Sequence, residues 1–345
     1  MKKIRLAIIF GGQSQEHEVS LESAKSVYAN CLKSEKILPL LLYIDRKGNW
    51  NLVDGSFFSV RGRGLPVSMD FSKGFISSGK KLSVDAAFSL IHGNTGEDGK
   101  LQGLLEMLKL PYAGCGVLSS AVSMDKKLTK TLAAIAGVPV LPDMIITSSG
   151  LKNFSAIKKE AKKLGYPIFV KPNTLGSSVG VKKVKSEKEL LPALKYALKY
   201  DREVLIEKGV DRAREIVCGL LGGYENYAAS PCGEVRVKGA HEFYDYSAKY
   251  LDDNGMELLI PAPLKSSVEK KIRDCAVKVF SAIKGYGLAR ADFFVDPKKP
   301  EKFYFCEINV IPGFTSHSLY PRLWEKGGIN TVALIEKIVS LALKK

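Results

Sequence analysis

The sequence predicts an α/β protein, and three observations support this fold class. The first third alternates short apolar stretches with amphipathic ones, which favours a parallel sheet flanked by helices. The middle third has the mixture of short strands and helices that is typical of a small α+β domain. The last third carries two apolar strands joined by a polar turn. With 345 residues, of which 46% are hydrophobic, the chain is long enough for two or three domains with cores of their own.

The first third is expected to begin with a buried strand over residues 4–10. Ser20 is the expected N-cap of the helix that follows, because apolar residues recur behind it at helical spacing. Residues 37–44 and 86–91 form the second and third strands, and a helix over residues 99–108 comes next. A sheet of this kind binds its ligands at the carboxyl ends of its strands.

The expected elements of the middle third are helices over residues 124–136 and 156–164, a strand over residues 168–170, a further helix, and a strand over residues 204–207. Ser186 and Glu189 form a capping box for the further helix. Pro192 leaves open whether that helix continues, because proline removes a backbone donor from a helix interior.

The last third is expected to contain strands over residues 215–221, 288–295 and 303–309, and a long polar and aromatic segment over residues 237–256. Between them lies a strongly periodic helix, for which Ser266 and Glu269 are the expected capping residues.

Composition excludes several classes of protein. The 52 lysines and arginines outnumber the 36 acidic residues, which gives a formal charge of +16. The basic residues occur mostly as pairs on helical stretches, where charge usually solvates an outer face, and no nucleic-acid-binding motif accompanies them. No apolar run approaches the ~20 residues that a membrane helix needs. The six cysteines are scattered without metal-binding spacing, so we expect reduced thiols in a cytoplasmic protein. From the charge pattern and the short apolar runs we expect neither nucleic acid nor a membrane as a partner.

Four polar side chains on the last two strands give the sharpest functional signal. Side chains two residues apart on a strand share a face, so Arg290 points with Asp292, and Glu307 points with Asn309. If the two strands pair as a hairpin, two carboxylates, one amide oxygen and one guanidinium meet in one patch. Hard oxygen ligands suit Mg²⁺, and the guanidinium would stabilise a phosphoryl group or an oxyanion. The alternative is a surface salt-bridge ladder, but the neighbouring strand end, beside Pro312, favours the metal site.

Two further loops carry weaker signals. Residues 176–180 form a glycine-rich loop after a strand that ends in Lys171, and such a loop lets backbone N–H groups approach phosphate oxygens. The loop is neither a Walker A loop nor a dinucleotide-binding fingerprint, and alone it is more often plain hairpin chemistry. Glu16 follows the first strand, where it either complements a helix dipole or binds a substrate ammonium group. The sequence around Glu16 does not decide between these two roles.

Seven segments occur in one order along nearly the whole chain: GGQSQEHEVSL (11–21), HGNTGEDGKLQG (92–103), PYAGCGVLSSAVSMDK (111–126), VKPNTLGSSVGV (170–181), FYDYSAKY (243–250), ARADFF (289–294) and EINVIPGFTSHSLYP (307–321). Together they resemble the D-alanine–D-alanine ligases, which have the ATP-grasp fold. The resemblance implies an N-terminal parallel α/β domain (residues 1–115) followed by two α+β domains (116–207 and 208–345) that clasp ATP. It also implies a homodimer.

The resemblance assigns a role to each matching residue. ATP would be bound by Lys126, Lys171 and Ser178 at the phosphates, by Glu207, Lys208 and Val210 at the adenine, and by Glu215 at the ribose. Two Mg²⁺ or Mn²⁺ ions would be held by Asp292, Glu307 and Asn309. The first D-alanine would meet Glu16, Ser177, Tyr250 and His92, and the second would meet Ser318 and Leu319. Arg290 and the Gly313 backbone N–H would stabilise the oxyanion, and Lys249 would reach the transferred phosphate.

The implied reaction is the ATP-dependent ligation of two D-alanines through an acyl phosphate, with release of ADP and phosphate, for peptidoglycan synthesis. Relatives that use D-lactate tend to lack the tyrosine found here as Tyr250, so its presence favours D-alanine, while D-serine stays open. A loop over residues 243–256 would close the site. The chain departs from the family pattern at residues 209–214, a hinge of variable length, and at Val310, where the family often has threonine. A non-catalytic nucleic-acid binder is the alternative of a different class, but it leaves the acidic patch unexplained.

Overall fold

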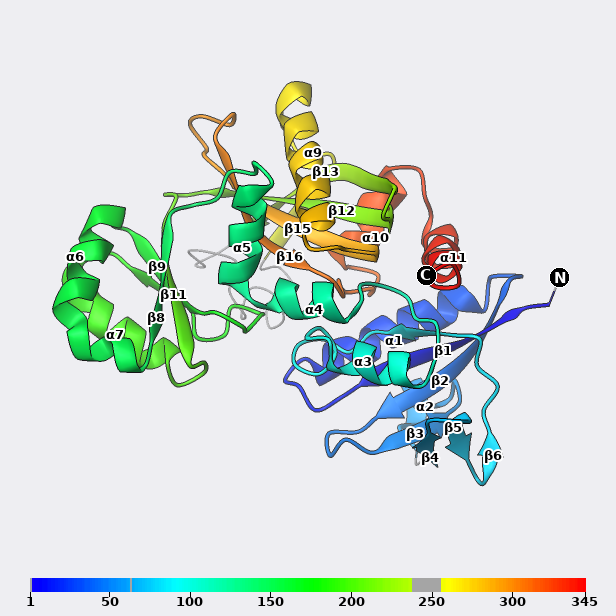
Figure 1. The fold of residues 1–345 in the computed structure, drawn as a ribbon. Helices are drawn as coiled ribbons and strands as arrows, with labels where there is room; N and C mark the ends of the chain where they lie inside the picture. The colour runs from blue at the N-terminus through cyan, green and yellow to red at the C-terminus, as the bar shows by residue number, and fades with distance from the viewer. Residues whose placement is uncertain (1, 63, 238–255) are drawn as a thin grey trace.

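Three β-sheets organise the computed structural model, which describes residues 2–62, 64–237 and 256–345. A seven-stranded sheet lies at one end of the molecule and a four-stranded sheet at the other, with a five-stranded sheet between them (Figure 1). The structure therefore confirms the α/β class predicted from the sequence. The predicted segment over residues 237–256 lies almost entirely outside the described residues.

The seven-stranded sheet has a parallel core, as predicted. Strand β1 (Ile4–Gly11) pairs in parallel with β2 (Ile37–Ile44) on one side and with β7 (Ala86–Ser89) on the other. Antiparallel strands that the sequence analysis missed extend the sheet beyond β2. These strands are β3 (Trp50–Val53), β4 (Leu65–Asp70), β5 (Gly74–Ser77) and β6 (Lys80–Lys81).

The prediction that Ser20 caps the first helix is wrong. Helix α1 (His17–Cys31) begins three residues earlier, and Ser20 lies fully buried within its first turn. The Ser20 hydroxyl donates to the Leu90 carbonyl at 2.6 Å and accepts from the Gly11 N–H at 2.9 Å. The serine thus ties the helix to the strand ends beneath it. Helices α2 (Phe57–Val60) and α3 (Lys100–Met107) complete this part of the chain.

A helix predicted over residues 124–136 is in fact the second of two consecutive helices. Helix α4 (Val117–Met124) ends at Asp125, whose extended backbone interrupts the chain before α5 (Lys126–Ile135). The Asp125 carboxylate then accepts from the Leu128 N–H at 2.8 Å, which is the N-cap bond of α5. Since aspartate caps helices readily, Asp125 was the missed signal for this break.

The four-stranded sheet is antiparallel and has the order β10-β9-β11-β8. Its strands are β8 (Asp143–Thr147), β9 (Ile168–Pro172), β10 (Lys182–Val184) and β11 (Glu203–Lys208). A short 3₁₀ helix, η1 (Ser149–Asn153), and helices α6 (Phe154–Leu164) and α7 (Glu187–Ala197) accompany it, and α7 runs through Pro192 without ending. Ser186 precedes α7 and donates to Glu189, but the Glu189 carboxylate accepts from the Lys185 N–H, so the capping box is shifted by one residue.

The five-stranded sheet is antiparallel, in the order β14-β13-β12-β15-β16. Its strands are β12 (Arg214–Gly223), β13 (Asn226–Val237), β14 (Met256–Leu259), β15 (Gly287–Val295) and β16 (Phe303–Asn309). Helix α9 (Ser266–Ala282) is capped at Lys265 rather than Ser266, and the predicted capping residue Glu269 instead accepts from the Cys232 N–H of β13. Helices α10 (Leu319–Lys326) and α11 (Thr331–Ala342) close the chain.

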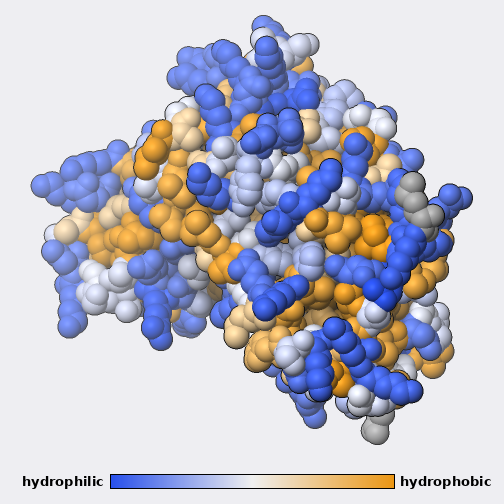
Figure 2. All heavy atoms as spheres, turned by 45° about the vertical axis from the view of Figure 1, so that its right-hand side comes forward, coloured by the Kyte–Doolittle hydropathy of each residue, from blue (hydrophilic) through white to orange (hydrophobic). Residues whose placement is uncertain are grey.

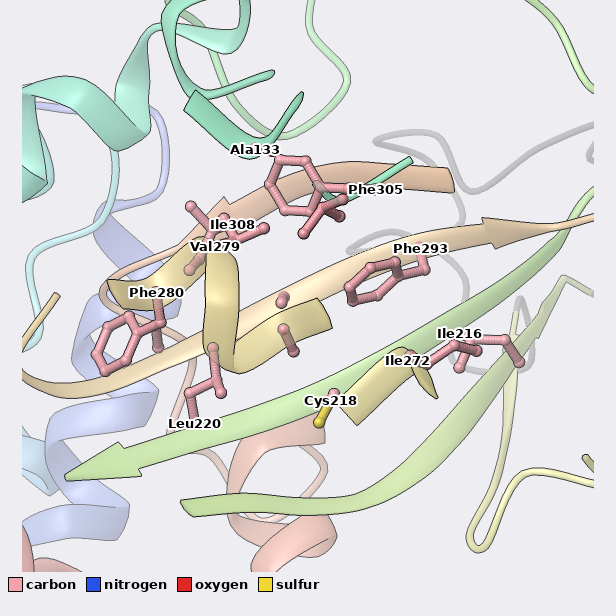
Figure 3. Close-up of a cluster of buried hydrophobic side chains, with 14 of the residues drawn as sticks. Ala133, Ile216, Cys218, Leu220, Ile272, Val279, Phe280, Phe293, Phe305 and Ile308 are labelled. Carbon is pink, nitrogen blue, oxygen red and sulfur yellow. The ribbon is translucent and has the colours of Figure 1, made fainter. Parts of the chain in front are cut away.

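Strand alternation divides the five-stranded sheet into an apolar face and a functional face. Ile216, Cys218 and Leu220 of β12 point toward α9, where they form one core with Ile272 and Phe280 of that helix (Figure 3). The opposite faces of β12, β15 and β16 carry Glu215, Asp292 and Glu307 beside apolar residues such as Val217. The core therefore determines which face of the sheet these polar side chains share.

The surface accounts for most of the positive charge. Hydrophilic residues cover most of the protruding surface in the view of Figure 2, and apolar ones gather in the regions between. Lys159, Lys162 and Lys163 of α6 are exposed in this way. Among the residues that the structure describes, none of the helices combines the length and apolar character required to cross a membrane.

We predict that Phe293→Ala strongly destabilises the protein. Phe293 of β15 is 1% exposed and contacts the rings of Phe303 and Phe305 edge-on. Its truncation leaves a cavity in the core and should cost about 3–5 kcal/mol, measured by urea denaturation followed by circular dichroism. The matched control is Phe294→Ala, one residue along and on the opposite face, which should cost less than about 2 kcal/mol because Phe294 is only half-buried and does not belong to that core. Equal losses in the two variants would contradict this division of the strand.

Candidate functional site

A cavity of about 450 Å³ lies between the four-stranded and five-stranded sheets. Its lining includes all of the residues predicted to bind a nucleotide, namely Lys126, Lys171, Ser178, Glu207, Lys208, Val210 and Glu215. Asp292 and Glu307, two of the three predicted metal ligands, line it as well. Residues separated by up to 181 positions in the chain therefore share one cavity.

Lys171 and Glu207 form a buried ion pair in the wall of the cavity. The Lys171 ammonium donates to Glu207 Oε2 at 2.7 Å across the antiparallel strands β9 and β11. Burial alone would lower the pKa of Lys171, but the charge of Glu207 raises it above its ordinary value. Conversely, burial would raise the pKa of Glu207, and the charges of Lys171 and Lys130 bring it below its ordinary value. Both groups are therefore charged at neutral pH, and Lys171 presents a fixed cation to the cavity.

The glycine-rich loop has the strained backbone of a binding loop. Ser177 and Ser178 both have positive φ, at 52° and 57°, which is uncommon for residues other than glycine. The Ser177 hydroxyl donates to Glu16 Oε1 at 2.5 Å, although the two residues lie 161 positions apart. This bond joins the loop after β9 to the start of α1. The predicted association of Ser177 with Glu16 therefore has a direct contact in the structure.

The N-terminus of helix α5 is hydrogen-bonded to the segment that leads into the glycine-rich loop. The Asn173 carbonyl accepts from the Lys126 N–H at 3.1 Å, and Asn173 Oδ1 accepts from the Lys127 N–H at 3.0 Å. The Lys126 ammonium donates to the Leu175 carbonyl. Lys126 is thus held beside the glycine-rich loop, where its charge faces the cavity.

Strands β15 and β16 bring the predicted metal ligands together. The register places Arg290 opposite Asn309 and Asp292 opposite Glu307, as the hairpin interpretation predicted. Arg290 donates to both oxygens of Asp292, at 2.7 and 2.6 Å. Asn309 Oδ1 accepts from the Ile311 N–H at 2.9 Å, which orients the amide. The Arg290–Asp292 ion pair, which belongs to the salt-bridge alternative, is therefore present, and Glu307 lies on the neighbouring strand.

The donor set of this patch fits a hard divalent cation. In the described parts of the chain no three histidine, cysteine, aspartate or glutamate side chains gather as a metal site, and the patch offers two carboxylates and one amide oxygen. Each carboxylate has about four lone-pair positions, so Asp292 retains acceptor capacity beside Arg290. Mg²⁺ usually takes one or two protein carboxylates and completes its shell with water and phosphate oxygens. The residues present meet that requirement.

A β-bulge beside the patch was not predicted. Asp292 pairs with Glu307, but the next residue, Phe293, pairs with Phe305, so Cys306 is an extra residue on β16. The bulge lets Cys306 and Glu307 both line the cavity. Burial raises the pKa of the Cys306 thiol well above its ordinary value, so the thiol is neutral there.

His92 belongs to a buried acidic cluster that includes a residue the sequence analysis missed. His92 Nδ1 lies 3.8 Å from Glu97 Oε1, and Glu97 Oε2 accepts from the Gly93 N–H at 3.0 Å. A Cβ atom on Gly93 would lie 3.1 Å from Glu16 Oε2, so glycine permits the close approach of Glu16. Glu97 lies within a segment that carried the family resemblance, but spacing alone gave it no partner.

Burial and neighbouring charges shift the pKa values of His92 and Glu97. Burial would lower the pKa of His92, but Glu97 and the charge of Glu16 raise it above its ordinary value. Burial and the charge of Glu16 raise the pKa of Glu97. The protonation of His92 and that of Glu97 therefore depend on each other.

The predicted acceptor residues lie at the start of α10. Ser318 is the N-cap of this helix, and its hydroxyl accepts from the Thr315 N–H at 2.9 Å. A Cβ atom on Gly313 would lie 2.8 Å from Ser318 Oγ, so the two residues are neighbours. The Leu319 side chain is buried against Val217, which leaves its backbone as the part able to meet a ligand. Lys249 and Tyr250, the remaining predicted residues, lie outside the described residues.

The chain is similar to known proteins over its whole length. The family model for the D-ala D-ala ligase N-terminus matches residues 5–115, and that for the D-ala D-ala ligase C-terminus matches residues 132–340. A D-alanine--D-alanine ligase of Thermoanaerobacter sp. (strain X514) is 44% identical, with 100% of this chain and 98% of the relative covered. D-alanine--D-alanine ligase A of Escherichia coli (strain K12) is 37% identical, with 100% and 97% covered.

Solved structures show the same fold. The VanG D-Ala:D-Ser ligase from Enterococcus faecalis superposes with a TM-score of 0.87 at 33% identity, covering 99% of this chain and 100% of that one. The D-alanine-D-alanine ligase from Coxiella burnetii gives 0.85 at 35% identity, covering 99% and 96%.

We predict that Glu97→Gln lowers the pKa of His92, because it removes the nearest negative charge while an amide oxygen can still accept from the Gly93 N–H. NMR titration of the imidazole C–H resonances measures this, and only four histidines contribute signals. The exposed His317 is the internal control and should titrate unchanged. An unaltered His92 titration would show that Glu97 carries no charge beside the imidazole.

Proposed function

The chain belongs to the D-alanine–D-alanine ligase family, and we propose that it joins two D-alanines to D-alanyl-D-alanine, at the expense of ATP, for peptidoglycan synthesis. One observation carries the assignment of the site. All seven predicted nucleotide-binding residues and the acidic pair Asp292 and Glu307 line a single cavity. Its volume, about 450 Å³, falls within the range of ordinary small-molecule sites.

ATP occupies this cavity in the proposal. Lys126 and Lys171 bind the phosphates, and Ser178 contributes from the glycine-rich loop, whose backbone is suited to anions. Glu207, Lys208 and Val210 contact the adenine, and Glu215 accepts from the ribose hydroxyls. Two acceptor positions of Glu207 are already used by lysines, and its remaining lone pairs suit an exocyclic amine.

Asp292, Glu307 and Asn309 would hold the Mg²⁺ or Mn²⁺ ions of the family, two in number. When bound, such ions neutralise charge on the phosphate oxygens. The support for this assignment is the cross-strand register and the hard-oxygen donor set of the three side chains.

The two D-alanines lie beyond the cavity, on the side of α1 and α10. Glu16 binds the ammonium of the first one, with Ser177, His92 and Tyr250 orienting this end. Ser318 receives the carboxylate of the second through its hydroxyl and the helix N-terminus, and Leu319 contributes its backbone N–H. The Glu16–Ser177 hydrogen bond supports this arrangement, because it joins the substrate end to the phosphate loop.

The reaction has two steps. An oxygen of the first D-alanine carboxylate attacks the γ-phosphorus, and the bond to the β-phosphate breaks. The products of this step are ADP and an acyl phosphate of D-alanine. The neutral amine of the second D-alanine then attacks the acyl carbon. The C–O bond to phosphate breaks as the tetrahedral intermediate collapses to the peptide, and the proton lost by the nitrogen leaves with the phosphate. Arg290 and the Gly313 N–H stabilise the oxyanion, and Lys249 contacts the transferred phosphate. The two bonds from Arg290 to Asp292 fix the guanidinium beside the acidic patch, which supports this role.

A homodimer and a cytoplasmic location follow from the family and complete the proposal. D-Serine as acceptor is the alternative that one observation favours, because the VanG D-Ala:D-Ser ligase superposes on this chain with a TM-score of 0.87.

The deciding experiment measures ADP release from ATP and Mg²⁺ with D-alanine, with L-alanine, and with D-alanine plus D-serine or D-lactate, and identifies each product. We expect ADP release that requires D-alanine, and D-alanyl-D-alanine as the main product. A mixed dipeptide or a depsipeptide as the main product would replace the proposed acceptor. Absence of D-alanine-dependent ADP release would refute the ligase assignment.

We predict that Glu307→Gln lowers kcat by at least about 100-fold while the melting temperature stays within a few degrees, because the variant removes one unit of charge from the metal ligands without changing volume. Phosphate release and circular dichroism measure the two quantities. The matched control is Glu301→Gln, an exposed glutamate in the turn between β15 and β16, which should leave kcat unchanged. Near-normal turnover in Glu307→Gln would remove Glu307 from the metal site.

A further inference from the structure

Five charged side chains alternate in sign along a path that ends at the nucleotide cavity. Lys127 pairs with Asp143 Oδ1, and Lys130 pairs with Asp143 Oδ2 at 2.7 Å. Lys130 also pairs with Glu207 Oε1, and Lys171 pairs with Glu207 Oε2 at 2.7 Å. Of these five side chains, Glu207 and Lys171 line the cavity, and only Lys127, at the opposite end, is substantially exposed.

Lys130 is the deepest charge in this path and has no role in the proposed reaction so far. Its side chain is 1% exposed, against 2% for Glu207 and 5% for Asp143. A third bond, from its ammonium to the Leu141 carbonyl at 3.0 Å, completes its donor capacity. A buried ion pair is weak evidence for stability, because apolar side chains of similar volume often serve as well. The presence of a lysine here therefore calls for another explanation.

The charges along the path sum to one positive unit, from three lysines and two carboxylates. If Glu207 were paired with Lys171 alone, the two would form a neutral pair facing the cavity. Lys130 occupies the other oxygen of Glu207 and offsets part of its charge. The positive surplus then remains available at Lys171, on the side where the phosphates bind.

Lys130 also connects the two walls of the cavity. Helix α5 packs on the five-stranded sheet, where Ala133 lies against Phe305 of β16 (Figure 3). Lys126 and Lys130 lie four residues apart on one face of this helix, and Lys126 lines the cavity one turn above Lys130. The bond from Lys130 to Glu207 reaches from this helix to the four-stranded sheet, so it fixes the direction of Glu207 and, through it, of Lys171.

We propose that Lys130 is a positioning residue for ATP: through Glu207 it sets the direction and the effective charge of the Lys171 ammonium that meets the phosphates. The proposal rests on the proposed nucleotide site but concerns binding of ATP alone. It therefore predicts an effect on ATP affinity that appears even without D-alanine.

The test compares Lys130→Met with Lys130→Arg in the full-length protein. We expect Lys130→Met to raise the Kd for MgATP, measured by calorimetry without D-alanine, at least about 10-fold, and to raise the KM for ATP equally. The KM for D-alanine should change by less than about two-fold, and Lys130→Arg should bind MgATP within about five-fold of wild type because it keeps the charge. Each carboxylate retains one lysine in Lys130→Met, through Lys127 or Lys171, so the fold should persist.

The matched control is Lys127→Met, on the same helix and with the same partner Asp143 but without contact to Glu207. Its Kd for MgATP should stay within about two-fold of wild type. Lys130→Gln replaces Lys130→Met if circular dichroism shows that the methionine variant does not fold.

An unchanged Kd in Lys130→Met or Lys130→Gln, equal weakening in Lys127→Met, or equal increases in both KM values would overturn the positioning role. These outcomes are distinct from failure of the proposed function. That failure would appear in the wild-type protein as absence of D-alanine-dependent ADP release.

Discussion

The geometry of the site depends on how the four-stranded and five-stranded sheets are held on either side of the cavity. Two contacts do this near the cavity. The Phe305 N–H of β16 donates to the Pro139 carbonyl at 2.8 Å, in the segment that leads into β8. Close by, Lys130 of α5 reaches Glu207 of β11. Because the segment and the helix are consecutive in the chain, residues 126–143 act as a brace between the sheets, and Lys171 and Glu307 meet one cavity from opposite walls.

A second constraint is the period-two alternation of β15 and β16. Every apolar residue committed to the core beneath α9 forces its neighbour onto the functional face. Phe293 and Asp292 illustrate this, since burial of the ring fixes the direction of the carboxylate. The bulge at Cys306 then breaks the alternation on β16, where the consecutive residues Cys306 and Glu307 both line the cavity. The apolar core and the polar site are thus two sides of the same strands.

These constraints explain which features could be predicted from the sequence. Strand alternation is local, so the shared face of Arg290 and Asp292, and of Glu307 and Asn309, could be predicted together with their hairpin. The parallel strands β1, β2 and β7 could be predicted because buried parallel strands are continuous apolar runs. Strands β3 to β6 could not, because they are short and form a half-exposed antiparallel extension without such runs.

Other features depend on partners distant in the chain. Ser20 has the composition of an N-cap, yet its hydroxyl bonds Leu90, 70 residues away, from inside a helix. The same holds for Ser266 and Glu269, since the carboxylate serves β13 instead of its own helix. The Lys130–Glu207 pair spans 77 positions, so no local pattern in the sequence indicates it. Local propensity predicts capping roles for Ser20 and Glu269, but contacts with distant parts of the chain determine their actual partners.

The division of the site into two regions also bears on acceptor choice. Four of the residues proposed to bind the nucleotide, Lys171, Glu207, Lys208 and Glu215, sit on paired strands. The residue proposed to bind the acceptor, Ser318, instead lies at the N-terminus of α10. It accepts a hydrogen bond from Thr315 and lies against Gly313. Since a D-Ala:D-Ser ligase shares this fold at a TM-score of 0.87, the common scaffold supports phosphoryl transfer without dictating the acceptor. If Ser318 binds the acceptor as proposed, a change of acceptor requires new side chains around it and leaves the braced cavity intact.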